Sequence, residues 1–155
     1  KQDYYFKFGT AAPFIPPGST DFPKSMPFAP SQQRYDTLKK YGNRIKQGIV
    51  MMDSLNKLEE IPDPALLDVY QLRPMGLMAN GFLASENTGT TNELLLSRYY
   101  INEMYLDISD MRNAVSQPEK EAAWKRAKQA CNSYLGLMNR VITQKVGDKF
   151  DLLSI

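Results

Sequence analysis

Three acidic residues, Glu103, Asp107 and Asp110, have a spacing that could support chemistry. Steps of four and three place them on one face of a helix, as in the carboxylate metal sites of helical bundles. Those sites also need a Glu-x-x-His motif on facing helices, and this chain contains no histidine. The three residues also lie opposite the apolar stripe of their own helix. We therefore expect a solvated acidic face and no metal site.

The remaining reactive residue types point away from catalysis. The absence of histidine excludes His-based triads, His-containing metal sites and the commonest general base. The single cysteine, Cys131, excludes an internal disulfide and thiolate zinc sites, and its place on an apolar stripe predicts a buried core residue. Gly76 and Gly81 have the glycine spacing of a phosphate loop, but Phe82 occupies the lysine position and no strand precedes them. We predict a protein that is not an enzyme and that needs no cofactor.

Two long amphipathic helices form the region in which these acidic residues lie. The first, 91–115, carries apolar residues at the spacing of a bundle helix: Leu94, Ile101, Met104, Ile108, Met111 and Val115. The second, 118–146, repeats that pattern with Trp124, Ala127, Cys131, Tyr134, Met138 and Val141. Two helices alone cannot bury both stripes, so the sequence predicts further helices packed against this hairpin.

Two more helices are expected before the hairpin. The helix at 33–58 has an apolar stripe at steps of three and four: Leu38, Tyr41, Ile45, Ile49, Met52 and Leu55. The helix at 63–84 should begin with Asp63 as its cap and Pro64 in its first turn. It should kink or restart at Pro74, which lacks an amide hydrogen. The predicted fold class is therefore an all-α, up-and-down four-helix bundle.

Short polar and glycine residues mark the ends of these helices. Ser116 and Glu119 have capping-box spacing at the hairpin turn, and Thr91 or Asn92 can cap the first arm of the hairpin. Gly147 should close the last helix. Within the first helix, Gly42 and Gly48 can allow a neighbouring helix to approach closely.

Residues 1–33 differ in composition from the rest of the chain. Six of the ten prolines lie there, which excludes regular helix and favours extended conformations. Seven aromatic residues accompany them, more than a disordered linker carries: Tyr4, Tyr5, Phe6, Phe8, Phe14, Phe22 and Phe28. The arm can fold back over its own bundle or dock on another protein, and the sequence leaves both readings open.

The first half of the helix at 33–58 is strongly basic, with Arg34, Lys39, Lys40, Arg44 and Lys46. These side chains form either a solvated face or a docking patch for an acidic partner or an anionic lipid surface. Together with the seven aromatic residues of the arm, Arg34, Lys39, Lys40 and Arg44 are the candidate partner-binding residues.

Length and composition describe one domain: 155 residues, 43% apolar and 23% charged, with a formal net charge of +2. This small charge gives no reason to expect nucleic-acid binding, and no apolar run approaches the roughly 18 residues that span a bilayer. Because the sequence begins at Lys1, we expect a processed mature chain or a fragment. We divide the chain into an extended arm (1–33), a bundle (34–147) and a short tail (148–155). The tail offers four apolar residues that can pack on a neighbour: Phe150, Leu152, Leu153 and Ile155.

The layout of a proline- and aromatic-rich arm before a helical bundle resembles the PsbQ family of extrinsic proteins of photosystem II. In the hairpin, 103–106 (Glu-Met-Tyr-Leu), 110–115 (Asp-Met-Arg-Asn-Ala-Val) and 116–120 (Ser-Gln-Pro-Glu-Lys) are similar to that family's Tyr-Leu, Asp-Leu-Lys and Pro-containing turn. The segments 67–70 and 74–77 are more weakly similar to an Asp-Val segment followed by Gly-Pro-Leu-Gly in cyanobacterial relatives. The family has one more long helix after this pair, whereas only a short tail follows here. Either this chain counts its helices differently or it belongs to a sister group. The candidate sister groups are the PsbQ-like extrinsic subunits of red algae and diatoms and the small four-helix assembly factor of photosystem II.

The resemblance implies a non-catalytic extrinsic subunit, peripheral on the lumenal face of the thylakoid membrane in the chloroplast. Its partners would be the photosystem II core and the other extrinsic lumenal subunits. Its role would be to stabilise the oxygen-evolving complex and its chloride and calcium retention. A photosystem II assembly factor is an alternative within the same setting. A small-molecule carrier with a Met- and aromatic-rich interior, and a peripheral membrane protein that binds through the basic helix, are alternatives from other classes.

Overall fold

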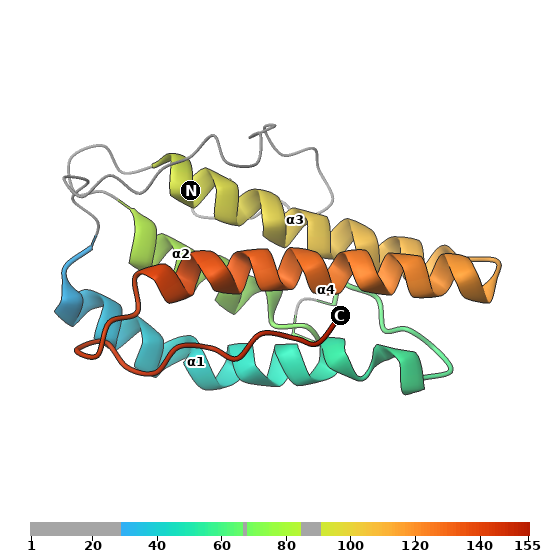
Figure 1. Cartoon of the computed structure of the whole chain (residues 1–155), viewed down its shortest axis with the longest axis horizontal. Coiled ribbons are helices and arrows are strands. Elements are labelled where there is room, and N and C mark those ends of the chain that lie inside the picture. Colours follow the sequence, from blue (N-terminus) through green and yellow to red (C-terminus); the bar gives the residue numbers. More distant parts are fainter. Residues whose placement is uncertain (1–28, 67, 85–90) are drawn as a thin grey trace.

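The computed structural model describes residues 29–66, 68–84 and 91–155. It contains four α-helices, α1 (Ser31–Asp53), α2 (Leu72–Leu83), α3 (Asn92–Asn113) and α4 (Gln117–Arg140), with a single 3-10 turn, η2 (Leu55–Lys57), and no strand in these ranges. The helices lie side by side and alternate in direction along the long axis (Figure 1). The most extensive contacts join α3 to α4, followed by α1 to α2 and α2 to α3. The predicted all-α, up-and-down four-helix bundle is confirmed.

The hairpin stripes form the centre of the core. Leu94, Ile101, Met104, Ile108 and Met111 of α3 face Ala127, Cys131, Tyr134 and Met138 of α4, and all are almost fully buried. Trp124 is only partly buried, and Val115 is not buried, because α3 ends at Asn113 and leaves Val115 90% exposed in the turn. The apolar stripe of α3 therefore predicted the packed face correctly, but the prediction that Val115 belongs to it is wrong.

Side-chain caps fix the first turn of each helix of the hairpin. The Thr91 hydroxyl accepts a hydrogen bond from the Leu94 amide (3.1 Å) and donates one to the Leu83 carbonyl (2.7 Å), so it joins the end of α2 to the start of α3. The Ser116 hydroxyl accepts a bond from the Glu119 amide at 3.3 Å at the start of α4. Both caps were expected from the sequence and are confirmed.

The second helix begins later than the sequence suggested. The Asp63 carboxylate accepts a bond from the Ala65 amide (2.9 Å), which closes a turn instead of starting a helix. Gln71 adopts a left-handed conformation (φ 56°) that interrupts the chain before α2. Pro74 then lies in the first turn of α2, where its missing amide hydrogen removes no helical bond. The expected restart near Pro74 is confirmed, whereas the start at Asp63 is wrong.

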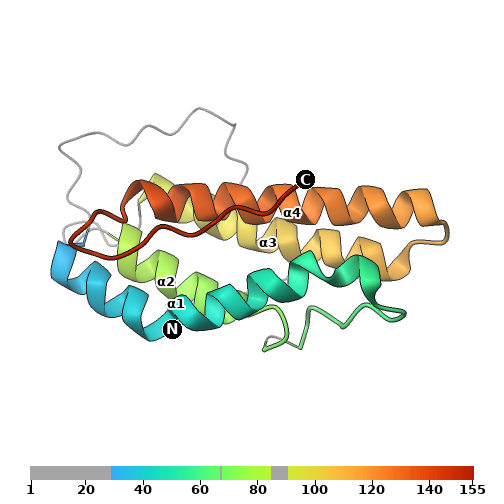
Figure 2. The same cartoon turned by 60° about the horizontal axis from the view of Figure 1, so that its bottom comes forward.

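The outer ends of α1 and α4 also differ from the sequence-based bounds. After Asp53 the chain continues as η2 and then as a loop, and α4 stops at Arg140. Gly147 has a positive φ (149°), but it follows a separate turn closed from Thr143 to Val146 (2.9 Å) and does not end the helix itself. Residues 148–155 then return along α4 (Figure 2).

Gly48 provides a close approach between α1 and the segment before α2. A Cβ at Gly48 would lie 2.3 Å from the Tyr70 carbonyl oxygen, whereas one at Gly42 would meet only Leu38 of its own helix, at 3.3 Å. The expectation of close packing is confirmed for Gly48 alone, and its neighbour is a loop instead of a helix.

In the described ranges, no helix has both the length and the apolar character needed to cross a membrane.

Candidate functional site

Seven of the candidate partner-binding residues lie in the arm, outside the described residues: Tyr4, Tyr5, Phe6, Phe8, Phe14, Phe22 and Phe28. Their role stays a prediction. The other four, Arg34, Lys39, Lys40 and Arg44, are all on α1, so the described part of the candidate surface belongs to one helix.

Arg34 is used within the fold. Its guanidinium donates to the Ala29 carbonyl (3.0 Å), to the Ser31 hydroxyl (3.3 Å) and to the Val141 carbonyl just beyond α4. Burial lowers the pKa of this guanidinium from its usual value. Arg34 therefore ties the start of α1 to the end of α4, and a partner would reach it only at its edge.

Lys39, Lys40 and Arg44 are exposed on the outer side of α1. None of the three has an ion-pair partner among the described carboxylates, and the Lys40 ammonium lies 5.3 Å from the centre of the Tyr41 ring. Their charge is thus available to an external acidic group.

Two apolar residues extend this surface and were missed in the sequence. Tyr35 is half-exposed and Val50 is 65% exposed. Steps of four, seven and four residues lead from Tyr35 to Lys39, Lys46 and Val50, so these four side chains lie in one row on the outward side of α1. The available signal was the position of Tyr35 and Val50 off the apolar stripe of the helix. Lys40 and Arg44, four residues apart, form a second row on the other flank of the exposed half of α1. We call the two rows together (Tyr35, Lys39, Lys46 and Val50; Lys40 and Arg44) the α1 outer face.

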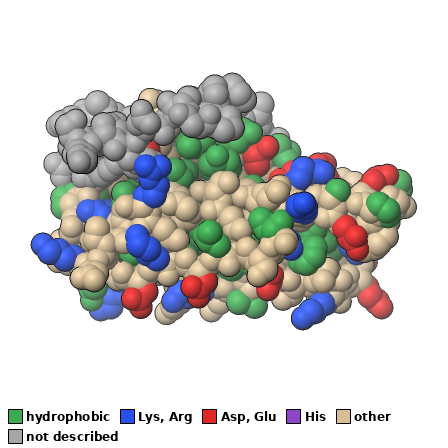
Figure 3. All heavy atoms as spheres, in the orientation of Figure 1, with side chains coloured by type: hydrophobic (Ala, Val, Ile, Leu, Met, Phe, Trp, Pro, Cys, Tyr) green, Lys and Arg blue, Asp and Glu red, His purple; other side chains and the backbone are tan. Residues whose placement is uncertain are grey.

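Basic and acidic side chains alternate with apolar ones over the face of the molecule drawn in Figure 3. Neither positively nor negatively charged side chains dominate this face. The face in this view therefore offers no extended basic surface to a polyanion.

The acidic residues Glu103, Asp107 and Asp110 are not a uniformly solvated face, and that expectation is wrong for Asp107. Its side chain lies at the seam of α3 and α4, and the residue is only 9% exposed. Arg126 of α4 approaches Asp107 at 3.6 Å and Asp110 at 3.5 Å. Burial and the charge of Glu103 raise the pKa of Asp107 to about 6, and Arg126 opposes that rise.

A surface pocket of about 230 Å³ adjoins this carboxylate, lined also by Tyr99, Tyr100, Glu103 and Arg126. The Tyr99 hydroxyl donates to Glu103 at 3.3 Å, and the two tyrosine rings meet edge to face. Among the described residues, no group of three or more Asp, Glu, Cys or His side chains is arranged to hold a metal ion. The carboxylates are satisfied by neighbours of their own chain.

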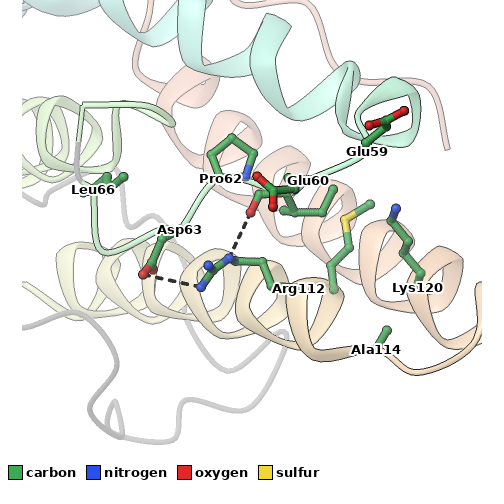
Figure 4. Close-up of a pocket in the computed structure, with 10 residues that line it drawn as sticks. Glu59, Glu60, Pro62, Asp63, Leu66, Arg112, Ala114 and Lys120 are labelled. Atoms are coloured by element: carbon green, nitrogen blue, oxygen red, sulfur yellow. Dashed lines mark hydrogen bonds and ion pairs between the residues drawn. The ribbon is translucent and has the colours of Figure 1, made fainter.

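A larger hollow of about 570 Å³ lies at the end of the bundle where α3 turns into α4. Arg112 crosses it, donating to the Ile61 carbonyl (2.9 Å) and pairing with Asp63 (3.4 Å), while Glu59 lies apart from this pair (Figure 4). Lys120 and Glu60 also line it. The hollow holds charges of both signs and no nucleophile with an adjacent base, and its bonds fix the loop after η2 to α3.

Cys131 is a core residue, as expected. It is fully buried, and burial raises the pKa of its thiol to about 12. Such a thiol stays protonated at neutral pH and is a poor nucleophile.

Comparison of this chain with protein-family models, with curated proteins and with solved structures finds no match in any of the three. The resemblance described from the hairpin motifs therefore stays a prediction, and the functional argument rests on the surfaces above.

Proposed function

We propose that this chain is a non-catalytic docking subunit that binds an acidic protein surface through the α1 outer face and the aromatic arm. The observation that carries the proposal is the set of exposed cations at Lys39, Lys40 and Arg44, which have no ion-pair partner among the described carboxylates. Tyr35 and Val50 add exposed apolar area in the row of Lys39. Charges steer a partner toward such a surface, and desolvated apolar groups then supply affinity.

The assembly we propose is photosystem II, on its lumenal side in the chloroplast. The support is the similarity of the hairpin motifs to the PsbQ family. The role would be to stabilise the oxygen-evolving complex and its retention of chloride and calcium. An assembly factor would use the same docking chemistry but would leave the mature complex.

Charge reversal on α1 tests the docking surface. The variant K39E/K40E/R44E should bind photosystem II membranes stripped of their extrinsic proteins about tenfold more weakly, because each reversed cation replaces an attraction with a repulsion. Co-sedimentation measures the binding. K57E/K125E/K145E is the matched control, because it makes the same net charge change at three other exposed lysines and should bind within about twofold of the unmodified chain. Equal losses in both variants would show that net charge matters and that the α1 outer face does not.

Three further experiments test the arm and separate the alternatives. Deleting residues 1–28 should preserve the helical circular dichroism and reduce binding, because it removes the seven aromatic residues and retains the Ala29 carbonyl that Arg34 uses. Binding to anionic vesicles without protein, weakened by the same K39E/K40E/R44E changes, would favour the peripheral membrane alternative. Co-purification with mature complexes, compared with assembly intermediates, separates a permanent subunit from an assembly factor.

The carrier alternative has less support. Met52, Met75, Met78, Met104 and Met138 are fully buried and packed in one continuous core. The two hollows described above open to solvent and are lined by charged side chains.

A further inference from the structure

Residues 148–155, the C-terminal segment, form neither helix nor strand, yet they follow a defined path. The segment runs back along α4, in the opposite direction to that helix and between it and α1 (Figures 1 and 2). Helices α1 and α4 have few direct contacts with each other, so the segment fills the furrow between them.

Two asparagines of α4 bind the backbone of this segment. The Asn139 side chain donates to the Phe150 carbonyl (3.0 Å) and accepts from the Phe150 amide (2.8 Å). The Asn132 side chain repeats this arrangement with the Leu153 carbonyl (2.9 Å) and amide (2.7 Å). Each carboxamide therefore satisfies both backbone groups of one residue, as a neighbouring strand would.

The spacing of the two pairs is matched along the helix and the segment. Seven residues of helix separate Asn132 from Asn139, a rise of about 10.5 Å. Three residues separate Phe150 from Leu153, and three residues of extended or polyproline-like chain cover about 9–10 Å. Helix and peptide thus stay in register over both pairs.

Burial along the segment follows the same period of three. Phe150 and Leu153 are buried, whereas Asp151, Leu152, Ser154 and Ile155 are exposed. A chain with three residues per turn places every third side chain on one face. Of the four apolar residues of the tail that can pack on a neighbour, Phe150 and Leu153 do so within this chain, whereas Leu152 and Ile155 are exposed.

A third contact continues the row beyond Asn132. Lys128 is only 7% exposed, and its ammonium lies 3.5 Å from the centre of the Trp124 ring while donating to the Ser154 carbonyl (3.1 Å). The Trp124 indole donates in turn to the Met52 carbonyl of α1 (2.8 Å). The bond from Trp124 to Met52 thus joins α4 to α1 across the furrow.

These contacts recognise mainly an extended backbone. The side chains of Asn132, Asn139 and Lys128 bond to amide and carbonyl groups of the segment, which every non-proline residue offers. The Lys149 side chain of the segment in turn donates to the Asn139 carbonyl and to the Ile142 carbonyl (2.9 Å). Side-chain selection rests on the two buried positions, one aromatic and one aliphatic, and on the lysine that precedes the aromatic residue.

We propose that the furrow between α1 and α4, lined on the α4 side by Trp124, Lys128, Asn132 and Asn139, is a peptide-binding site. The chain's own C-terminal segment occupies it in this structure. In place of that segment it accepts an extended stretch of a partner protein that carries an aromatic and an aliphatic residue three positions apart. The attached segment has an effective concentration in the millimolar range, so a partner stretch enters when it binds more tightly or when the segment is loosened.

The test uses the full chain, in a variant whose C-terminal segment binds the furrow more weakly. The variant F150A/L153A removes both buried side chains and leaves the furrow intact. The probe is a fluorescein-labelled peptide with the sequence of residues 148–155, followed by fluorescence anisotropy. It should bind F150A/L153A saturably, and about tenfold more weakly to the unmodified chain, whose own segment competes.

Two controls assign that binding to the furrow. Adding N132A/N139A to the F150A/L153A chain should reduce probe affinity about tenfold, because both backbone pairs are lost. A probe with alanine at the positions of Phe150 and Leu153 should not bind. Absence of saturable binding to an F150A/L153A chain with native helical circular dichroism would overturn the proposal, as would equal affinity in the N132A/N139A background.

A second measurement needs no variant and covers the case in which F150A/L153A does not fold. Hydrogen exchange of residues 148–155 in the unmodified chain should rise severalfold when unlabelled peptide is added in excess, with no change in α3. Unchanged exchange at saturating peptide would mean that the segment is a fixed part of the core and would contradict the proposal. A dimer whose formation depends on Asn139 would show that a second copy, and not a partner protein, supplies the stretch.

Discussion

Asp107 is a carboxylate that the fold holds partly neutral near pH 6. Because its pKa rises from 3.8 to about 6 on folding, the folded state binds its proton more tightly than the unfolded chain does. Stability from this group is therefore lost as the pH rises from about 4 to about 6, and it stays lost above that range.

The variant D107N should remove this pH dependence. It should stabilise the fold at pH 7 by about 1–3 kcal/mol relative to the unmodified chain, and by much less at pH 4, where the native carboxyl is already protonated. Urea unfolding at the two pH values measures the difference. The exposed neighbour provides the control: D110N should change stability by less than about 0.5 kcal/mol at both pH values. Equal destabilisation of D107N at pH 4 and pH 7 would show that the hydrogen-bonding shape of the carboxylate matters and its charge does not.

Gly48 is a residue at which backbone atoms of a neighbouring segment leave no room for a side chain. We expect G48A to lower the free energy of unfolding by about 2–3 kcal/mol, because its Cβ would lie 2.3 Å from the Tyr70 carbonyl oxygen and the backbone would have to move. This cost exceeds the gain of about 1 kcal/mol that alanine brings to a helix. Thermal or chemical unfolding followed by circular dichroism measures it.

Gly136 of α4 is the matched control for Gly48. A Cβ there meets nothing within 4 Å, so G136A should stabilise the protein by about 0.5–1 kcal/mol. Destabilisation by both substitutions would contradict the steric explanation. The sequence showed both glycines in helices, but only the path of residues 70–71 distinguishes them.

Among the helices, the ends that carry local signals were predictable. Thr91 and Ser116 cap their own helices, and this chemistry is contained within four residues. The start of α2 was not predictable, because Asp63 and Pro64 are as typical of a turn as of a helix start. The left-handed conformation of Gln71, which interrupts the chain before α2, has no sequence signature.

The Thr91 cap also joins two helices, and its removal should exceed a simple capping effect. The variant T91V keeps the shape but loses the bonds to the Leu94 amide and the Leu83 carbonyl, so it should cost about 2 kcal/mol of stability. S116A, at the exposed cap of α4, should cost about 1 kcal/mol or less. Urea unfolding of the two variants compares them, and an equal cost would mean that the bond to Leu83 contributes nothing.

For the whole molecule, the seven-residue stripes were enough to predict a four-helix bundle. The course of the C-terminal segment was not predictable, because the bonds of Asn132 and Asn139 depend on where a distant part of the chain returns. The candidate docking residues were likewise predictable only in part. Composition singled out the basic half of α1, but only the packed structure shows that Arg34 is used internally while Lys39, Lys40 and Arg44 are exposed.

The bond from Arg34 to the Val141 carbonyl also bears on the order of folding. It closes a loop of 107 residues, whereas the α3–α4 hairpin forms from contacts between near neighbours in sequence. Loop-closure entropy makes distant contacts form after local ones, so we expect the hairpin to be present before the start of α1 is anchored. A partner that needs the start of α1 in its anchored position would then bind only chains in which this late contact has formed.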